Sequence, residues 1–121
     1  MGTEFNILNP GQNPFTGQRS YEVPNQPHKI YQIAKFGEII LITYLAAGKP
    51  ALNKNVYAYD KAGNVLWIIE TQSLDEKIDD PYIYVAFSEK YQCVRVEKYG
   101  GSYWRLDVET GKVTYLGSSQ R

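Results

Sequence analysis

Two stretches of similar sequence decide the fold: VYAYDKAGNVLW, residues 56–67, and YWRLDVETGKVTY, residues 103–115. Aligned on Asp60 and Asp107 they lie 47 residues apart (107 − 60), and aligned on Gly63 and Gly111 they lie 48 apart (111 − 63). That spacing is the length of one four-stranded antiparallel sheet with its turns. The repetition therefore predicts a duplicated β-meander.

Each stretch also has a local reason to form a hairpin. Asp60 is expected to accept hydrogen bonds from amides of its own turn, and Gly63 is expected to take a positive φ. Alternating apolar residues on both sides of the turn favour strands. Each stretch therefore predicts two strands joined by a tight turn.

Extending this pattern outward gives an all-β fold of two four-stranded antiparallel meanders, stacked half-propeller-like or as an open sandwich. The run at residues 39–45 is apolar throughout, which predicts burial on both faces. The two repeats cover residues 29–70 and 82–116 of one β domain, residues 29–121. The eight expected strands are residues 29–36, 39–45, 55–60, 64–69, 82–87, 92–98, 103–107 and 112–116.

The N-terminal segment differs in composition from the rest of the chain. Residues 6–28 contain four of the six prolines, with many Asn and Gln, a composition that supplies few ladder donors. We expect residues 1–28 to form an arm that either wraps the domain or is loose. Residues 1–5 resemble a remnant of an expression vector and are left out of the fold.

The chain length, the net charge and the N-terminal sequence limit the functions that the protein can have. The chain has 121 residues, suited to one domain, and thirteen Lys+Arg balance thirteen Asp+Glu. This balance excludes the broad basic surface of a nucleic-acid or anionic-membrane binder, so we expect neither partner. The longest apolar run is far shorter than a membrane helix, and no charged-then-apolar leader opens the chain, so we expect a cytoplasmic location.

The repeated stretches resemble the blade repeats of β-propellers, particularly quinoprotein-like blades, in which an apolar pair, Asp, a short loop, Gly and an apolar strand with Trp follow one another. The resemblance implies a half-propeller of two blades, fewer than the four to eight of a closed ring. Tyr115 stands where the blades carry Trp. The cofactor-binding residues of quinoprotein enzymes have no counterpart, so none of their activity is implied. The matching residues are Tyr57, Tyr59, Asp60, Gly63, Val65 and Trp67, then Trp104, Leu106, Asp107, Gly111, Val113 and Tyr115.

Catalytic chemistry has few candidates. His28 is the only histidine and Cys93 the only cysteine, which excludes a disulfide and a Cys/His metal cluster. Arg95, two residues from Cys93, offers a weak case for an activated thiol. We expect no enzyme, no metal and no cofactor.

Two groups of residues suggest partner binding. Residues 71–80 concentrate four carboxylates, and Ser73 with Glu76 matches a capping box for a short helical turn. Five tyrosines, at 82, 84, 91, 99 and 103, exceed what a small core needs and are expected to be exposed anchors. The predicted partner-binding residues are Asp75, Glu76, Asp79, Asp80, Tyr82 and Tyr99.

These patterns favour a non-catalytic protein-binding domain, such as a bacterial inhibitor or toxin-immunity protein, with a homodimer as an open alternative. The alternative function is a small-ligand or carbohydrate-binding module with an aromatic cleft between the sheets. A second aromatic set is expected to pack between the sheets: Tyr57, Tyr59, Trp67, Trp104 and Tyr115.

Overall fold

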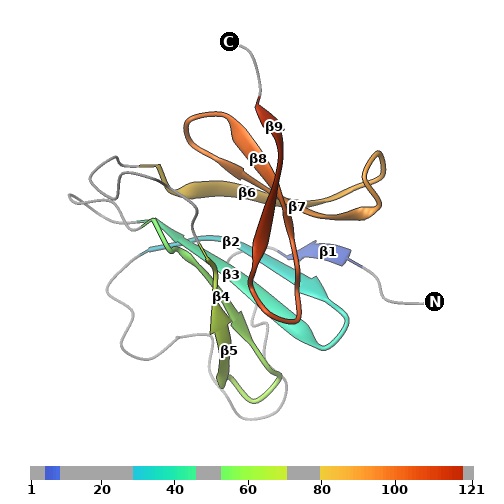
Figure 1. The fold of residues 1–121 in the computed structure, drawn as a ribbon. Coiled ribbons are helices and arrows are strands. Elements are labelled where there is room, and N and C mark those ends of the chain that lie inside the picture. The colour runs from blue at the N-terminus through green and yellow to red at the C-terminus, as the bar shows by residue number, and fades with distance from the viewer. Residues whose placement is uncertain (1–4, 9–28, 46–52, 71–79, 119–121) are drawn as a thin grey trace.

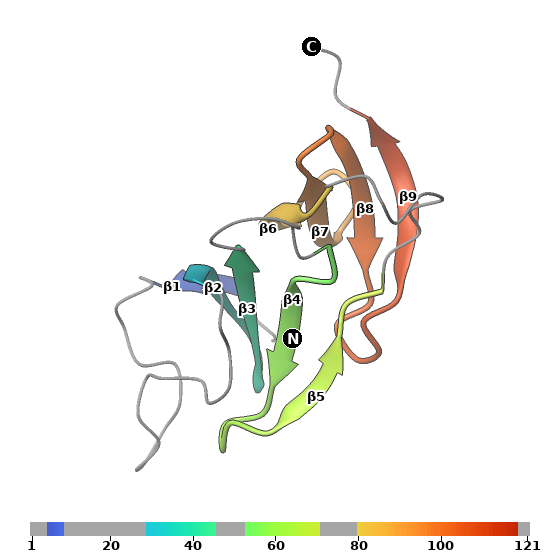
Figure 2. The same cartoon turned by 90° about the vertical axis from the view of Figure 1, so that its left-hand side faces the viewer.

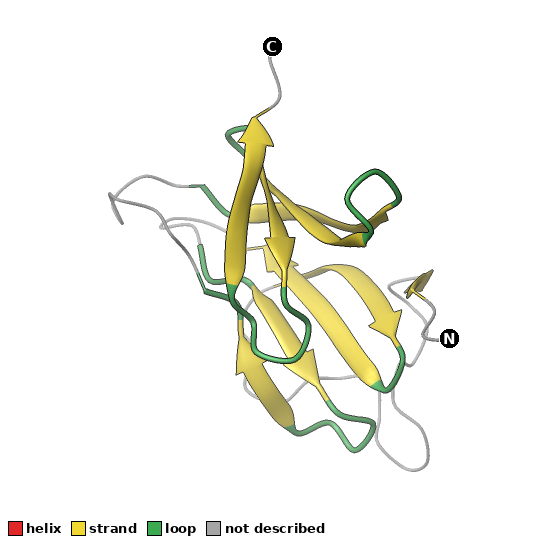
Figure 3. Cartoon of the chain, turned by 45° about the vertical axis from the view of Figure 1, so that its right-hand side comes forward, coloured by secondary structure: helices red, strands yellow, loops and turns green. Residues whose placement is uncertain are grey.

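The computed structural model describes residues 5–8, 29–45, 53–70 and 80–118, and within these ranges every regular element is a β-strand (Figure 3). The strands form two antiparallel sheets, in the orders β1-β2-β3-β4-β5 and β6-β7-β8-β9 (Figure 1). The first sheet contains β1 (Phe5–Leu8), β2 (Lys29–Phe36), β3 (Ile39–Leu45), β4 (Val56–Tyr59) and β5 (Val65–Ile68). The second contains β6 (Tyr82–Ser88), β7 (Cys93–Lys98), β8 (Ser102–Leu106) and β9 (Val113–Ser118).

The predicted all-β fold of two antiparallel meanders is confirmed, and each of the eight predicted strands is present with ends shifted by at most two residues. The first sheet differs by one added strand. Strand β1 pairs antiparallel with β2, and the Phe5 ring lies 6.4 Å from the Phe36 ring. Residues left outside the predicted domain thus complete the sheet, because their apolar side chains continue both of its faces.

The turn chemistry is confirmed in both repeats. Asp60 Oδ1 accepts hydrogen bonds from the amides of Ala62 and Asn64, each at 2.9 Å, and bonds to Asn64 hold the pKa of the Asp60 carboxyl below its usual value. Asp107 Oδ1 likewise accepts from the Glu109 amide. Gly63 and Gly111 have φ of 91° and 83°, a region that glycine enters without steric cost.

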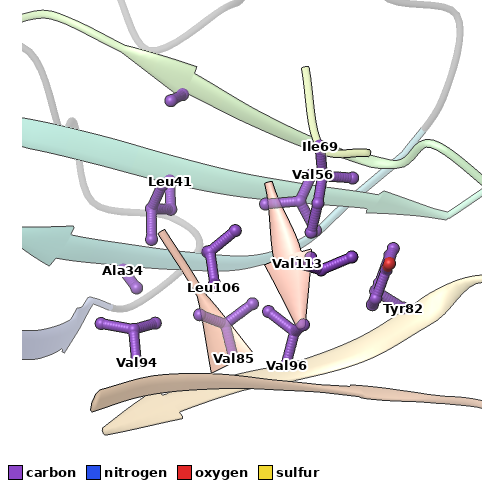
Figure 4. Packing of buried hydrophobic residues seen from close by; sticks show 11 residues of the cluster. Ala34, Leu41, Val56, Ile69, Tyr82, Val85, Val94, Val96, Leu106 and Val113 are labelled. Carbon is purple, nitrogen blue, oxygen red and sulfur yellow. The ribbon is translucent and has the colours of Figure 1, made fainter. Parts of the chain in front are cut away.

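The core lies between the two sheets (Figure 4). Side chains from β2, β3 and β4 meet side chains from β6 to β9, and Trp67 and Trp104 pack against them. Burial of this apolar surface is the main force that holds the sheets together. The buried members are Ala34, Leu41, Val56, Ala58, Ile69, Tyr82, Val85, Val94, Val96, Leu106 and Val113.

A second buried cluster lies on the opposite face of the first sheet. In β3, Leu41 belongs to the core, whereas Ile40, Ile42 and Tyr44 belong to the second cluster. Because neighbouring residues of a strand point to opposite faces, the second cluster faces away from the second sheet. The predicted burial of this strand on both faces is confirmed.

The repeats use their faces in opposite ways. Tyr57 and Tyr59 of the first repeat correspond to Trp104 and Leu106 of the second, but the tyrosines belong to the outward cluster while Trp104 and Leu106 face the core. The front of the first unit, the face with Val56 and Ala58, therefore packs against the back of the second, the face with Trp104 and Leu106. Figure 2 shows the two sheets lying side by side. Repetition of one unit about an axis produces this front-to-back packing, and the resemblance to propeller blades implies such an arrangement. The resemblance itself stays a prediction.

This stacking corrects the prediction that five aromatic residues pack between the sheets. Trp67 and Trp104 do so, but Tyr57 and Tyr59 lie on the far face of the first sheet. Tyr115 is 55% exposed and meets the Trp104 ring edge-on, with centroids 5.2 Å apart. Sequence similarity between repeats does not reveal that equivalent residues face different surroundings.

Amide side chains from the first sheet close the open edge of β6. The buried Asn55 donates from Nδ2 to the carbonyl of Tyr82 at 2.7 Å, and its Oδ1 accepts from the Tyr82 amide at 2.9 Å. Gln32 repeats this exchange with the amide and carbonyl of Val85, at 3.0 and 2.8 Å. The two amides satisfy backbone groups that a neighbouring strand would otherwise bind. We call these two residues the amide clamp.

A second set of polar contacts joins β5 to the β8–β9 turn. Trp67 Nε1 donates to the Val108 carbonyl at 2.8 Å, and the Glu70 amide donates to the Gly111 carbonyl at 3.0 Å. A Cβ on Gly111 would lie 2.6 Å from Trp67 Cε3, so only glycine lets the indole approach this turn. The turn of the second repeat is thereby fixed on the first sheet.

We predict that Asn55→Ala lowers the free energy of unfolding by about 3 kcal/mol, because it leaves the buried amide and carbonyl of Tyr82 without partners. Asn64→Ala is the matched control, since it removes only an exposed bond to Asp60 and is expected to cost about 1 kcal/mol or less. Urea unfolding followed by tryptophan fluorescence measures both. Equal losses in the two variants would contradict the role of the amide clamp.

Candidate functional site

The predicted partner-binding residues fall into two groups. Asp75, Glu76 and Asp79, together with the predicted helical turn, lie outside the described residues. The structure describes Asp80, Tyr82 and Tyr99 and brings them together where β6 begins and the β7–β8 turn passes.

Asp80 is occupied by contacts within the chain. Its Oδ1 accepts a hydrogen bond from the Gly100 amide at 2.7 Å, and its own amide donates to Asn53 Oδ1 at 2.8 Å. Beside it, the Tyr99 amide donates to the Pro81 carbonyl at 2.8 Å. This carboxylate thus ties the start of β6 to the β7–β8 turn, a structural task.

Lys98 lies at the same corner with only 3% of its side chain exposed. Its Nζ is 4.0 Å from Asp80 Oδ2, 5.2 Å from the centroid of the Tyr82 ring and 5.7 Å from that of Trp104. Burial lowers the pKa of the Lys98 amine, and the nearby Asp80 carboxylate opposes part of this effect. Lys98 is a cation held on the core face of the second sheet by one carboxylate and two rings.

The prediction that Tyr82 is an exposed anchor is wrong. Its side chain is fully buried in the core, and its hydroxyl donates to the Glu70 carbonyl at 2.9 Å. The reason is a register shift between Tyr82 and Tyr84, which turns Tyr82 inward along with Val85 while Tyr84 points outward. Tyr99, in contrast, is 72% exposed, as expected.

Three of the five predicted anchor tyrosines lie on the outer face of the second sheet: Tyr84, Tyr91 and Tyr103. In β7, Val94 and Val96 point to the core, so Arg95 and Glu97 point outward, as their alternation predicts. Their register partners on β8 are Arg105 and Tyr103, and Tyr84 on β6 pairs with Glu97. We call Tyr84, Tyr91, Tyr103, Arg95 and Arg105 the tyrosine–arginine face.

Contacts within this face hold several of its side chains in place. The Arg95 guanidinium stacks 4.8 Å from the centroid of Tyr103 and lies 3.8 Å from Glu97 Oε1. The Tyr91 ring is 6.4 Å from the Tyr103 ring. Cation–π and aromatic contacts of this kind restrict side-chain motion before any partner arrives.

Comparison of the repeats shows why this face is unusual. Arg95, Arg105 and Tyr103 occupy the positions that Leu41, Ala58 and Val56 occupy in the first repeat. Those three apolar residues pack against the second sheet. No described strand covers the corresponding face of the second sheet. Positions that are packed core in one repeat therefore carry arginine and tyrosine in the other, on a face that no described strand covers.

Catalytic and metal-binding groups are sparse in the described part of the chain. It holds no cluster of three or more His, Cys, Asp or Glu residues that could bind a metal ion. Cys93 is a half-exposed free thiol whose register partner is Ser88, and His28 lies outside the described residues. Across the same ranges, no helix has the length and apolar character to cross a bilayer.

Comparison with known proteins places the chain in a family. The model of the family described as Domain of unknown function (DUF7957) matches residues 21–117. The chain belongs to this family. The span of the DUF7957 domain includes both repeats and leaves β1 outside. No curated protein and no solved structure matches the chain.

The buried amine of Lys98 predicts a pH effect on stability. Between its lowered folded-state pKa and the ordinary value of 10.5, the unfolded chain binds this proton more tightly, so the free energy of unfolding rises with pH. Urea unfolding from about pH 7.5 to about pH 9.5 should show this rise in the wild type, and the Lys98→Met variant should lack it.

The pH range stops there because burial raises the pKa of Tyr59 to about 12, which gives the opposite slope above pH 10. Parallel pH profiles for the wild type and Lys98→Met would show that Lys98 keeps its ordinary pKa in the folded protein.

Proposed function

We propose that this protein is a non-catalytic protein-binding domain that uses the tyrosine–arginine face. The observation that carries the proposal is the exchange between repeats: Leu41, Ala58 and Val56 in the first unit are replaced by Arg95, Arg105 and Tyr103 on the open face of the second. The partner takes the place that a further sheet would take in a longer array.

The residue types on this face favour a binding surface over a face that merely ends the stack of sheets. A terminal repeat needs a polar outer face for solubility, and lysine, glutamate or threonine would supply one. Tyrosine and arginine are instead the residues that contribute most binding energy at protein interfaces. Tyr84 is 48% exposed, so a partner has apolar ring surface to bury.

The inhibitor or toxin-immunity interpretation is one case of this function and belongs to the same proposal, as does a cytoplasmic location. Of the four acidic residues predicted to bind a partner, Asp80 is engaged with Gly100 and Lys98, and Asp75, Glu76 and Asp79 lie outside the described residues. A test that neutralises these four carboxylates should therefore use Asp80→Asn, which keeps an oxygen for the Gly100 amide, or leave Asp80 unchanged.

The alternative of a ligand-binding cleft between the sheets has less support. Packed core side chains fill the region between them, among them Tyr82 (Figure 4). A carbohydrate or other small ligand would have to use the exposed rings of the outer face instead. Such a ligand is an alternative outcome of the experiment below.

Site-specific photo-crosslinking tests the proposal. A photoreactive phenylalanine analogue is placed at Tyr84 on the proposed face, and at Leu66 on β5 as a control of similar exposure, 48% in both. In a lysate of the source organism, we predict one defined protein adduct from position 84 and none from position 66. Tyr103→Ala should abolish that adduct while leaving the domain folded, because it removes the ring on which Arg95 stacks.

Equal labelling at both positions, or no protein adduct at position 84, would refute the proposal. An adduct that contains only a second copy of the chain would identify the alternative homodimer. Binding of a glycan with no protein adduct would favour the carbohydrate-binding alternative.

A further inference from the structure

We infer that the partner of the tyrosine–arginine face presents an acidic segment, whose carboxylates the Arg95–Arg105 pair binds. The inference rests on the proposed function and adds the chemistry of its partner.

The two arginines lie side by side on neighbouring strands. Arg95 on β7 and Arg105 on β8 are register partners, so their Cβ atoms are roughly 5 Å apart on the same outer face. Like charges in directly opposed positions destabilise a sheet. The free protein thus carries an unfavourable pair that a bound anion relieves.

Among the described ion pairs, the carboxylate near these two charges lies beside Arg95. Glu97 lies 3.8 Å from Arg95, and its side chain is 16% exposed. Arg105 is exposed, and within the described residues no ion pair involves it. One guanidinium is therefore still open to a carboxylate from outside.

The surroundings favour binding of a planar anion in two ways. The Arg95 guanidinium is stacked on Tyr103, so little side-chain freedom is lost when a ligand binds it. The row of Arg95 and Arg105 continues with Ala86 on one side and Thr114 on the other, so small side chains flank the two arginines. Guanidinium forks pair with carboxylates through two parallel hydrogen bonds.

An acidic protein segment fits this face better than a nucleic acid does. A nucleic-acid groove uses many cations along a phosphate backbone, whereas this chain has no net charge and Glu97 lies between Tyr84 and Tyr103 in the adjacent row. A few carboxylates beside apolar residues would match two guanidiniums flanked by tyrosine rings.

Titration followed by NMR tests the inference with three probes: a poly-glutamate peptide, a poly-glutamine peptide of the same length and an oligothymidylate of matched length. We expect poly-glutamate to shift the signals of Arg95, Arg105 and Tyr103, and poly-glutamine to leave them unchanged. Arg105→Gln should weaken the poly-glutamate affinity about tenfold, and Arg105→Lys should weaken it less, because lysine keeps the charge without the fork.

Lys61→Gln is the matched control. It removes the same charge from an exposed position of the first sheet, where Lys61 pairs with Glu38, and should change the affinity less than twofold. Equal loss in Arg105→Gln and Lys61→Gln, absence of poly-glutamate binding, or tighter binding of oligothymidylate would each overturn the inference. A Tyr84 adduct combined with absent poly-glutamate binding would reject the acidic partner and leave the proposed function standing.

Discussion

Closure of the β6 edge is the constraint on which the arrangement of the two sheets depends. An edge strand exposes amide and carbonyl groups that must find partners or water. Here Asn55 and Gln32 of the first sheet supply both a donor and an acceptor to β6, at Tyr82 and at Val85. Each side-chain amide acts as a short piece of a neighbouring strand. The second sheet therefore cannot slide along the first without breaking buried hydrogen bonds as well as apolar contacts.

The fixed stacking determines which surface is left open. Since the front of the first unit packs against the back of the second, the front of the second unit is left on the outside of the described structure. The first unit covers its Leu41 and Ala58 side with the second sheet, and the second unit leaves the corresponding side, with Arg95 and Arg105, uncovered by any described strand. Front-to-back stacking of a duplicated unit thus turns a core position into a surface position. The substitutions at those positions are the link between the fold and the proposed binding function.

Much of the fold follows from the sequence, because its signals are local. The alternation of apolar residues and the Asp-to-Gly turns place eight strands and two hairpins without tertiary information. Tyr82 shows where local reasoning ends: alternation gives it the same face as Tyr84, and the register shift between them reverses this. The sequence does not reveal the contacts of Asn55 and Gln32 with β6, because a polar residue in a strand gives no sign of the distant backbone that it binds. Arg105 could have been found by aligning the repeats strand by strand, since its counterpart Ala58 is apolar.

Hydrogen exchange of the Tyr82 and Val85 amides in the intact protein tests the central claim most directly. Both amides lie on β6, the edge strand of the second sheet, and would exchange rapidly if only water bound them. The account predicts that they exchange as slowly as amides paired between β7 and β8, because Asn55 Oδ1 and Gln32 Oε1 hold them. Exchange as fast as that of the exposed turn at Lys61 would contradict the account, since the second sheet would then have an open edge.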